Sequence, residues 1–418
     1  MARKKKPRGQ ADNPFKPGAG HSPPYLAGRE DERDQFKRFL AQTTITDNVV
    51  LTGLRGVGKT VLMDDVYKPL ALSEGWVWVG ADFSESAFVD EAALCRRILT
   101  DLSVYTSALE VETERTARMG LTSTRTARED VDYEYLGEFF NAQPGLNSDK
   151  LKATLEWTWN AVKGLGKKGI LFAYDEAQVV QDRKKKEQYP LALLLETFQS
   201  IQRKGVKMML LLTGLPTLFP KLVESRTYAE RMFKIQEIGK LNEIASRKAI
   251  TEPLKGNAIQ FTKESIDMIV QETCGYPYFI QFICREAYDI FQSAVSSGIT
   301  PSIPIKTLVK KLDSDFFAGR WAPVPDRQRE LLFCIANLEN AADEFTVNQI
   351  ADISHALRRK DIRPFKYADV SSMMPKLINA GLVYKNRHGK YSLAVPLLHG
   401  FVKRQFEEPE VIQLSLFD

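Results

Sequence analysis

An eight-residue stretch near the start of the chain, GLRGVGKT, has the residue types and spacing that bind the phosphates of a nucleotide. It completes the pattern G-x-x-x-x-G-K-[ST]. The glycines let backbone N–H groups curl around a β-phosphate, the lysine reaches the β- and γ-phosphates, and the threonine hydroxyl binds Mg²⁺. A strand-like apolar run precedes the stretch and a helix-like run follows it, as the pattern requires. We therefore predict a site for a nucleotide and Mg²⁺, lined by Gly53, Leu54, Arg55, Gly56, Val57, Gly58, Lys59, Thr60 and Val61.

Two further strand ends carry polar residues suited to hydrolysing such a nucleotide. The run ILFAYDEAQ is an apolar strand that ends in Asp175 and Glu176. Asp175 is expected to hold Mg²⁺ with Thr60, and Glu176 to act as general base toward the attacking water. In MMLLLTGLP, Thr213 at the strand tip is expected to reach both that water and the γ-phosphate. The alternatives are structural: acidic residues also favour a helix N-terminus, and a threonine also ends a strand.

Short apolar runs alternate with helical periodicity over the first half of the chain. Strands are predicted at 48–52, 76–79, 170–174 and 208–212, with a weaker fifth at 233–238, and a helix at 191–202. This alternation predicts an α/β fold with a parallel sheet covered on both faces. Residues 105–150 are polar and interrupt the pattern, so we expect an insertion there.

The second half is predicted to be helical and then to form a separate small unit. Thr262 is the expected N-cap of one helix, and APVPD at 322–326 marks a linker. The predicted organisation is a basic N-terminal segment at 1–24, too polar to bury a core, a nucleotide-binding domain at 25–241, a helical lid at 242–321, a third unit at 326–405 and a flexible tail at 406–418.

The order of these motifs resembles that of the AAA+ ATPases. YLAGREDERDQF at 25–36 is similar to the segment that precedes the phosphate loop in origin-recognition initiators and STAND-like ATPases. The resemblance implies ATP hydrolysis, strand order 5-1-4-3-2, a helical lid, adenine contacts near Gly28 and Arg29, and a homo-oligomer. It also implies an arginine finger that reaches a neighbouring subunit's γ-phosphate, for which Arg226 and Arg231 are both candidates.

The lid departs from many AAA+ proteins at one position. Where these often carry an arginine that contacts the γ-phosphate, CGYPYFIQ has Tyr276 and Pro277. STAND-like ATPases look similar here, and the resemblance places Pro277 by the nucleotide. This departure puts in doubt whether the lid senses hydrolysis in the usual way.

Residues 326–405 read as three helices followed by a hairpin, which resembles the winged helix of AAA+ initiators. In such DNA readers the third helix enters the major groove and the wing contacts phosphates. The alternative is a winged helix used only for protein contacts. Pro375 is expected to shorten or bend the third helix. The predicted contacts to double-stranded DNA are Arg358, Arg359, Lys360, Lys376, Lys385, Arg387 and Lys390.

The tail contains QLSLF, which matches the short peptide that docks bacterial polymerases and repair factors on the replication sliding clamp. The resemblance implies that Leu416 and Phe417 enter an apolar pocket, while Gln413, Leu414 and Ser415 complete the motif. A tail that folds back on the protein is the alternative. A clamp partner implies a bacterial cytoplasm and association with the nucleoid.

Charge and cysteine content narrow the class of protein. Net charge is +5, and residues 346–404 hold eleven lysines and arginines against three aspartates, while residues 1–20 hold six against one. Basic ends on a net acidic remainder favour a polyanionic partner. The sequence contains no run of 18 apolar residues, so no membrane span is predicted. The four cysteines are widely scattered, which argues against a zinc site or a disulfide framework.

Together these patterns predict an ATP-driven switch on DNA, docked to the sliding clamp. One alternative is a STAND-like signalling or defence ATPase whose winged helix binds protein. Another is a replication initiator or a mobile-element regulator.

Overall fold

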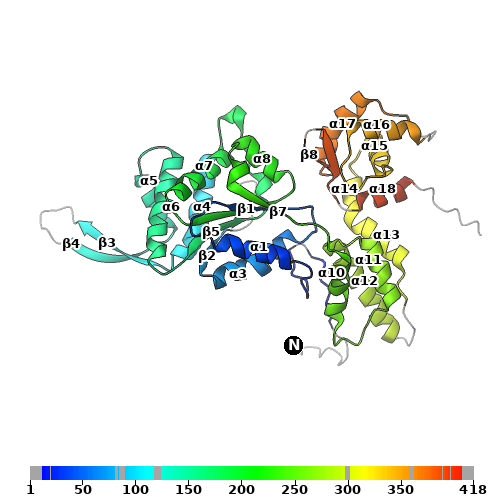
Figure 1. Cartoon of the computed structure of the whole chain (residues 1–418), viewed down its shortest axis with the longest axis horizontal. Coiled ribbons are helices and arrows are strands. Elements are labelled where there is room, and N and C mark those ends of the chain that lie inside the picture. Colours follow the sequence, from blue (N-terminus) through cyan, green and yellow to red (C-terminus); the bar gives the residue numbers. More distant parts are fainter. Residues whose placement is uncertain are drawn as a thin grey trace, which may run out of the picture. The chain divides into compact units, whose positions relative to one another are not determined.

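The computed structural model describes residues 12–18, 20–80, 83, 90–116, 124–296, 302–357, 362–387, 389–395 and 397–406. The chain forms two compact units (Figure 1). The sheet unit comprises Arg29–Gly53 and Lys59–Ile238, and the helical unit comprises Met1–Gly28, Leu54–Gly58 and Gly239–Asp418. Each unit is described by itself.

Five parallel strands form the centre of the sheet unit, in the order β2-β5-β6-β1-β7. By position in the chain this is the predicted order 5-1-4-3-2, so that expectation is confirmed. Every residue of β1, β5 and β6 is buried, which explains why these strands read as continuous apolar runs. The strands are β1 (Asn48–Thr52), β2 (Trp76–Val79), β5 (Gly169–Tyr174), β6 (Met208–Gly214) and β7 (Phe233–Glu237).

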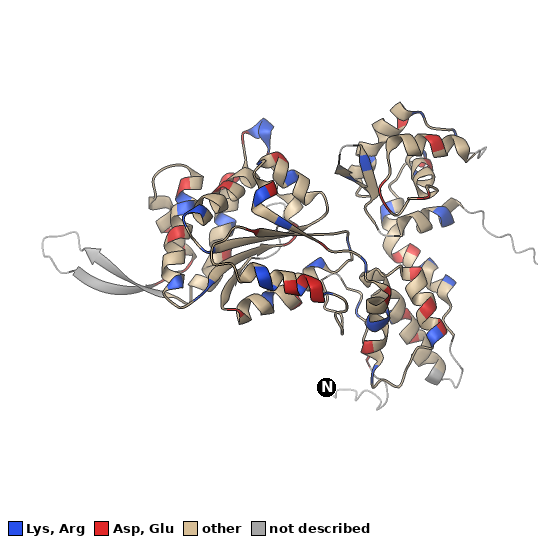
Figure 2. Ribbon diagram, viewed as in Figure 1, with Lys and Arg blue, Asp and Glu red and all other residues tan. Residues whose placement is uncertain are grey.

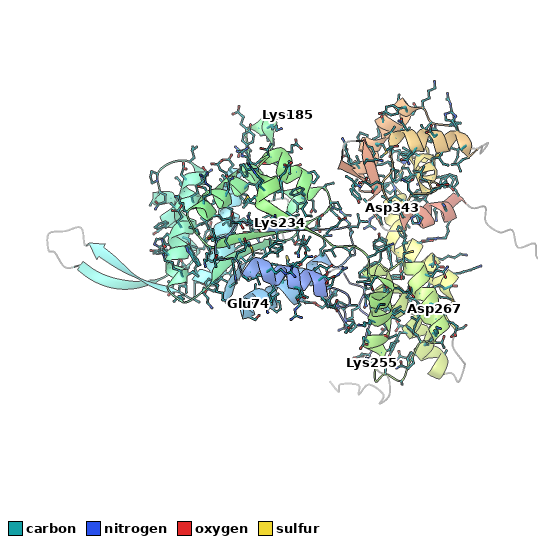
Figure 3. All side chains as sticks on the ribbon, in the orientation of Figure 1. Glu74, Lys185, Lys234, Lys255, Asp267 and Asp343 are labelled. Carbon is teal, nitrogen blue, oxygen red and sulfur yellow. The ribbon has the colours of Figure 1, made fainter. Side chains whose placement is uncertain are left out.

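Helices cover both faces of this sheet. Figure 1 shows α1 and α3 on one side and α7 and α8 on the other. The charged side chain of Lys185 extends outward from the unit (Figure 3). The helical elements are α1 (Glu30–Leu40), α2 (Lys59–Leu62), η1 (Met63–Tyr67), α3 (Lys68–Ser73), α4 (Glu91–Thr106), α5 (Tyr133–Ala142), α6 (Asn147–Lys163), η3 (Ala177–Val179), η4 (Lys184–Lys186), α7 (Pro190–Arg203), α8 (Leu218–Ser225) and α9 (Ala229–Met232).

The polar stretch expected to be an insertion contains an antiparallel two-stranded ribbon. Its strands are β3 (Glu110–Thr116) and β4 (Thr124–Asp130), paired from Glu110 with Asp130 to Thr116 with Thr124. The ribbon forms its own sheet, separate from the five-stranded one. Helices α5 and α6 then lead back to β5.

The region predicted to be a lid, 242–321, is a run of helices in the helical unit. Thr262 caps α11 as predicted, because its side chain accepts a hydrogen bond from the Ser265 N–H. The elements are α10 (Glu243–Thr251), η5 (Glu252–Leu254), α11 (Lys263–Thr273), α12 (Pro277–Ser296), α13 (Ile305–Leu312), η6 (Asp313–Phe317) and α14 (Ala318–Trp321).

A segment ahead of the sheet unit packs on α12. Phe15 is 1% exposed and stacks on Phe261, with ring centroids 6.3 Å apart. The Asn13 amide donates to the Arg285 carbonyl at 2.9 Å and to Asp289 Oδ1 at 2.8 Å. The segment 1–24 was predicted to be too polar to bury a core, yet its residue Phe15 is part of the hydrophobic core of the helical unit.

The end of the helical unit has three helices and a ribbon, followed by one more helix. Thr346 caps α16 and forms a capping box with Gln349. Helix α17 runs 13 residues through Pro375, so the expected shortening is wrong. The proline is on the exposed side of the helix. The elements are α15 (Asp326–Ala336), α16 (Val347–Ala356), α17 (Tyr367–Asn379), β8 (Val383–Arg387), β9 (Lys390–Leu393) and α18 (Leu398–Phe406).

Helix α18 was not predicted. Its buried residues Leu398, Phe401 and Val402 have the i, i+3, i+4 spacing of an amphipathic helix. That signal spans only nine residues, and its register is clear only once the neighbouring helix α15 is known. Over the described ranges, no helix has both the length and the apolar character needed to cross a bilayer.

Candidate functional site

The carboxyl ends of β1, β5 and β6 bring several predicted site residues together. Gly53, directly after β1, donates its N–H to the Gly214 carbonyl at 3.3 Å, which fixes the start of the phosphate loop to β6. Lys59 opens α2 and is only 8% exposed. Its ammonium donates to the Gly53 carbonyl at 3.0 Å. The lysine charge is thus held beside the point where the loop leaves the sheet.

Thr60 and Asp175 are in direct contact. The Thr60 hydroxyl donates to Asp175 Oδ2 at 2.5 Å, and Asp175 is 3% exposed. The other carboxylate oxygen, Oδ1, accepts the Glu176 N–H at 2.8 Å. Mg²⁺ prefers oxygen ligands, and here a hydroxyl oxygen and a carboxylate oxygen are adjacent. The predicted metal ligands are therefore neighbours, although they are 115 positions apart in the chain.

Glu176 has an unusual backbone conformation. Its φ is 52°, in the left-handed region that few residues other than glycine adopt. Such a conformation costs roughly 1–3 kcal/mol and persists only where its surroundings hold it. The conformation turns the chain sharply after β5, so that buried Asp175 is followed by an exposed glutamate.

Gln178 holds the Glu176 side chain and was missed by sequence reasoning. Its amide Nε2 donates to Glu176 Oε2, and its Oε1 accepts the Leu215 N–H at 3.1 Å. A Cβ at Gly214 would lie 2.4 Å from that Oε1, so only glycine leaves room for the contact. Gln178 is the last residue of the run ILFAYDEAQ, but nothing in the sequence predicts its hydrogen bond with the Leu215 N–H beyond β6.

Thr213 is in β6 opposite Leu51 of β1 and is completely buried. Its hydroxyl contacts the Met63 sulfur at 3.6 Å. The side chain thus packs against η1, whereas Glu176 is held by Gln178. The structure does not bring the Thr213 hydroxyl and the Glu176 carboxylate into contact.

The two candidate arginine fingers differ in their surroundings. Arg226 ends α8, where it forms an ion pair with Glu196 at 3.7 Å and donates to the Ser225 carbonyl at 3.1 Å. Arg231, on α9, is exposed, and no ion pair of its side chain is found among the residues that the structure describes.

The rest of the phosphate loop packs on the lid. The Gly56 carbonyl accepts the Tyr278 N–H at 3.2 Å, one residue after Pro277 begins α12. Gly56 and Gly58 have φ values of 79° and 91°. These positive values explain why glycine stands at both positions of the loop. Gly28 has φ 63°, and a Cβ there would lie 2.6 Å from that of Ala245. In the sheet unit, Arg29 is 7% exposed and pairs with Glu32 at 3.2 Å.

The predicted DNA contacts are only partly within the described residues. Lys376 on α17 and Lys385 on β8 are exposed, and Lys390 on β9 is half-buried. Figure 2 shows acidic and basic residues interspersed on both units. Arg358, Arg359 and Lys360, the side chain of Arg387 and the QLSLF motif lie outside the residues described.

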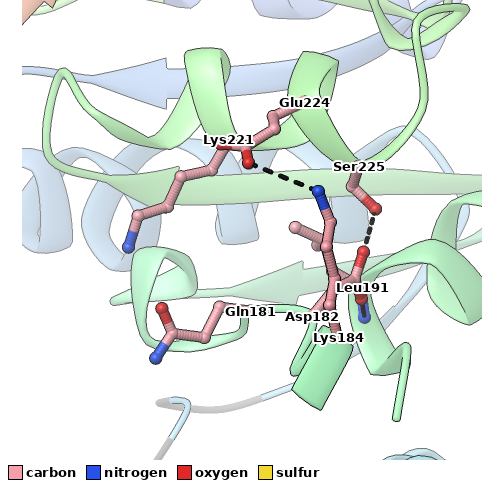
Figure 4. Close-up of a pocket in the computed structure, with 7 residues that line it drawn as sticks. All are labelled: Gln181, Asp182, Lys184, Leu191, Lys221, Glu224 and Ser225. Atoms are coloured by element: carbon pink, nitrogen blue, oxygen red, sulfur yellow. Dashed lines mark hydrogen bonds and ion pairs between the residues drawn. The ribbon is translucent and has the colours of Figure 1, made fainter. Parts of the chain in front are cut away.

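A small pocket of about 130 Å³ lies between the segment 181–184, α7 and α8, and it does not contain the predicted nucleotide residues (Figure 4). Asp182 accepts a hydrogen bond from the Ser225 hydroxyl at 2.5 Å and also caps α7 through the Leu191 N–H at 3.0 Å. Lys221 donates to the Gln178 carbonyl at 2.9 Å, and burial lowers the pKa of its ammonium. These hydrogen bonds connect η3, Asp182, α7 and α8, and the pocket lies where these segments meet.

Comparison with known proteins identifies two matched regions. Residues 25–223 match a family model described as an AAA ATPase domain, and residues 314–402 match a domain of unknown function, DUF8462. A search of the curated proteins gives no match.

The comparison with solved structures gives matches that extend over about nine-tenths of the chain. The Walker-type ATPase PABY2304 of Pyrococcus abyssi has a TM-score of 0.55 and 15% identity, covering 90% of this chain and 96% of its own. The Aeropyrum pernix ORC1 protein, solved in complex with DNA, has a TM-score of 0.45 and 16% identity, covering 91% and 93%. The Aeropyrum pernix ORC2 protein has values of 0.46 and 15%, covering 93% and 97%.

The sheet order, the phosphate loop and the matched domain agree with one another. The chain has the α/β fold of an AAA+ P-loop ATPase, and it is an enzyme that hydrolyses ATP.

Proposed function

We propose that this protein is an ATP-driven switch that binds double-stranded DNA and docks on the bacterial sliding clamp. Two observations support its two halves. The ATP half rests on the Thr60–Asp175 contact at 2.5 Å beside the phosphate loop. The placement at the clamp rests on the five residues QLSLF.

In the proposed reaction the loop amides and Lys59 bind the ATP phosphates. Thr60 and Asp175 would hold Mg²⁺, which neutralises charge on the phosphates when bound. Glu176 accepts a proton from the attacking water as the water oxygen bonds to the γ-phosphorus and the bond to the β-phosphate oxygen breaks. ADP and inorganic phosphate leave. Thr213, at the tip of β6, is assigned a supporting role toward the attacking water and the γ-phosphate.

Gln178 is assigned the task of aiming Glu176. Its amide links the Glu176 carboxylate to the Leu215 N–H at the end of β6. Because the Gln178 amide is itself bonded at both ends, the Glu176 carboxylate that it holds points in a fixed direction, which proton transfer requires. Gln178 is therefore a positioning residue.

Arg231 is the better supported finger in the proposed homo-oligomer. Arg226 already pairs with Glu196, whereas Arg231 is exposed and forms no ion pair over the described ranges. A finger must leave its own subunit to reach a neighbour's γ-phosphate, so a side chain without an internal partner loses less on doing so.

The DNA part of the proposal uses α15 to β9, which we interpret as a winged helix. Lys376 is exposed on the third helix and Lys385 on the first strand of the hairpin, at the two positions where such domains contact DNA. Each cation is suited to neutralise one phosphate.

One observation favours the STAND-like alternative, in which this domain binds protein. The exposed side of α17 includes Tyr367, which is 59% exposed, while Lys376 is the basic residue within the helix and Asp369 lies in its first turn. An exposed tyrosine with little net charge is more typical of a protein interface than of a DNA-reading helix.

Substitution Glu176→Gln tests the assigned base. Without a proton acceptor, ATP binding is expected to persist while phosphate release falls roughly 10²- to 10⁴-fold. Glu187→Gln is the matched control, because Glu187 is also exposed with φ 52° but stands outside the site. Normal hydrolysis by the Glu176 variant would remove its role as base.

Substitution Gln178→Ala tests the positioning role. The turnover number is expected to fall roughly tenfold to a hundredfold because the base is no longer aimed, with little change in KM for ATP. Gln181→Ala, in the same segment, is the control. Gln178→Glu replaces the amide donor by a like charge, so the turnover number is expected to fall at least as far as in Gln178→Ala. A normal turnover number in both variants would contradict the contact.

The salt dependence of duplex DNA binding tests the winged-helix assignment. Replacing Lys376 and Lys385 by alanine is expected to reduce the slope of log affinity against log salt by about 2, since two phosphate contacts are lost. The control is the same charge loss at exposed lid residues, Lys255→Ala/Lys263→Ala. Equal losses in both variants, or no salt dependence at all, would favour the protein-binding alternative.

Surface plasmon resonance on an immobilised bacterial sliding clamp tests docking. The full chain is expected to bind with micromolar or tighter affinity, and Leu416→Ala/Phe417→Ala is expected to abolish binding because the two pocket-filling side chains are removed. Val411→Ala/Ile412→Ala removes apolar side chains just outside the motif and should leave binding intact. If the full chain does not bind, the clamp assignment fails and the signalling alternative gains.

A further inference from the structure

Gln178, which holds the Glu176 carboxylate, is itself held at two points by the stretch of chain that follows β6. Its side-chain oxygen Oε1 accepts the Leu215 N–H at 3.1 Å, and its backbone carbonyl accepts a hydrogen bond from the Lys221 ammonium at 2.9 Å. The first contact fixes the end of the side chain. The second fixes the backbone from which that side chain extends, and it comes from α8.

The backbone that carries Gln178 has little support of its own. It belongs to η3, a 3₁₀ turn of only three residues, Ala177–Val179. Such turns have poorer hydrogen-bond geometry than an α-helix. The preceding residue, Glu176, has a φ of 52°, a conformation that persists only where its surroundings hold it. The direction in which the Glu176 carboxylate points therefore depends on contacts made from outside this turn.

Helix α8 supplies two such contacts from one side. Lys221 bonds to Gln178, and the hydroxyl of Ser225, four residues further along the helix, donates to Asp182 Oδ2 at 2.5 Å (Figure 4). Residues four apart are neighbours on a helix surface. The other carboxylate oxygen of Asp182 accepts the Leu191 N–H at the start of α7, at 3.0 Å. The segment 178–182 is therefore fastened to α8 at one end and to both α7 and α8 at the other.

The two lysines that line the pocket beside this segment have different partners. Lys184 is exposed and pairs with the exposed carboxylate of Glu224 at 3.8 Å. Lys221 is half-buried, and burial lowers the pKa of its ammonium. Within the part of the chain that the structure describes, this ammonium forms no ion pair, and its hydrogen bond goes to the Gln178 carbonyl. Burying a charge is costly unless hydrogen bonds compensate it, so this bond is important for the side chain as well as for the turn.

We propose that Lys221 is a positioning residue for ATP hydrolysis. Its ammonium fixes the Gln178 backbone, and the Gln178 amide in turn fixes the Glu176 carboxylate toward the attacking water. A base that moves away from the direction of proton transfer loses rate, whereas nucleotide binding depends on the phosphate loop and is unaffected. This role rests on those proposed above for Glu176 and Gln178. It extends the support of the site to α8, a helix that contains none of the predicted nucleotide residues.

Substitution Lys221→Met tests this role, because methionine is also long and unbranched but cannot donate a hydrogen bond. In the full chain with saturating ATP and Mg²⁺, the turnover number for phosphate release is expected to fall roughly tenfold, with little change in KM. Lys221→Arg keeps a charged donor and is expected to retain most of the activity. Lys184→Met, at the exposed lysine of the same pocket, is the matched control. A normal turnover number in Lys221→Met, or an equal loss in Lys221→Arg, overturns the proposal.

A double variant separates positioning from a general defect in folding. Because Lys221 is proposed to act through Gln178, Gln178→Ala/Lys221→Met should hydrolyse ATP no more slowly than Gln178→Ala alone. Losses that multiply would show that Lys221 acts elsewhere, and would overturn the role. If Gln178→Ala itself hydrolyses ATP normally, the proposed aiming of Glu176 fails. If Gln178→Ala is slow and Lys221→Met is normal, only the role of Lys221 fails.

Discussion

The nucleotide site depends above all on the hydrogen bond between Thr60 and Asp175. It joins the first turn after the phosphate loop to the end of β5, and Asp175 is almost fully buried. A carboxylate in such a place is costly unless it is hydrogen-bonded or binds a cation. The Thr60 hydroxyl and the Glu176 N–H donate those hydrogen bonds to the Asp175 carboxylate. The same contacts therefore fix the place where Mg²⁺ is expected and the position of the Glu176 backbone.

The parts of this site that were predicted are those that the sequence encodes locally. The strands were evident because residues buried on both faces form continuous apolar runs, and the glycines of the loop stand where φ must be positive. Their order in the sheet came from the AAA+ resemblance. Gln178 could not be predicted, because its role depends on the Leu215 N–H, 37 positions away.

Other features were missed for similar reasons. Phe15 stands in a polar, proline-rich segment, and its burial depends on a site formed by Phe261 and the lid helices more than 240 positions later. Tyr278 of α12 contacts Phe316 of η6, and these two aromatic residues belong to different helical elements. Contacts of this kind are set by packing, which periodicity does not reveal.

The close approach of Gly214 to Gln178 limits which substitutions the site can accept. Any side chain at 214 would occupy the space of the side-chain amide oxygen Oε1 of Gln178. A shorter residue at 178 would free that space but release Glu176. The two positions therefore form one unit for protein engineering: a side chain at 214 would displace the Gln178 amide, and each such variant would have to supply a new way of holding the glutamate.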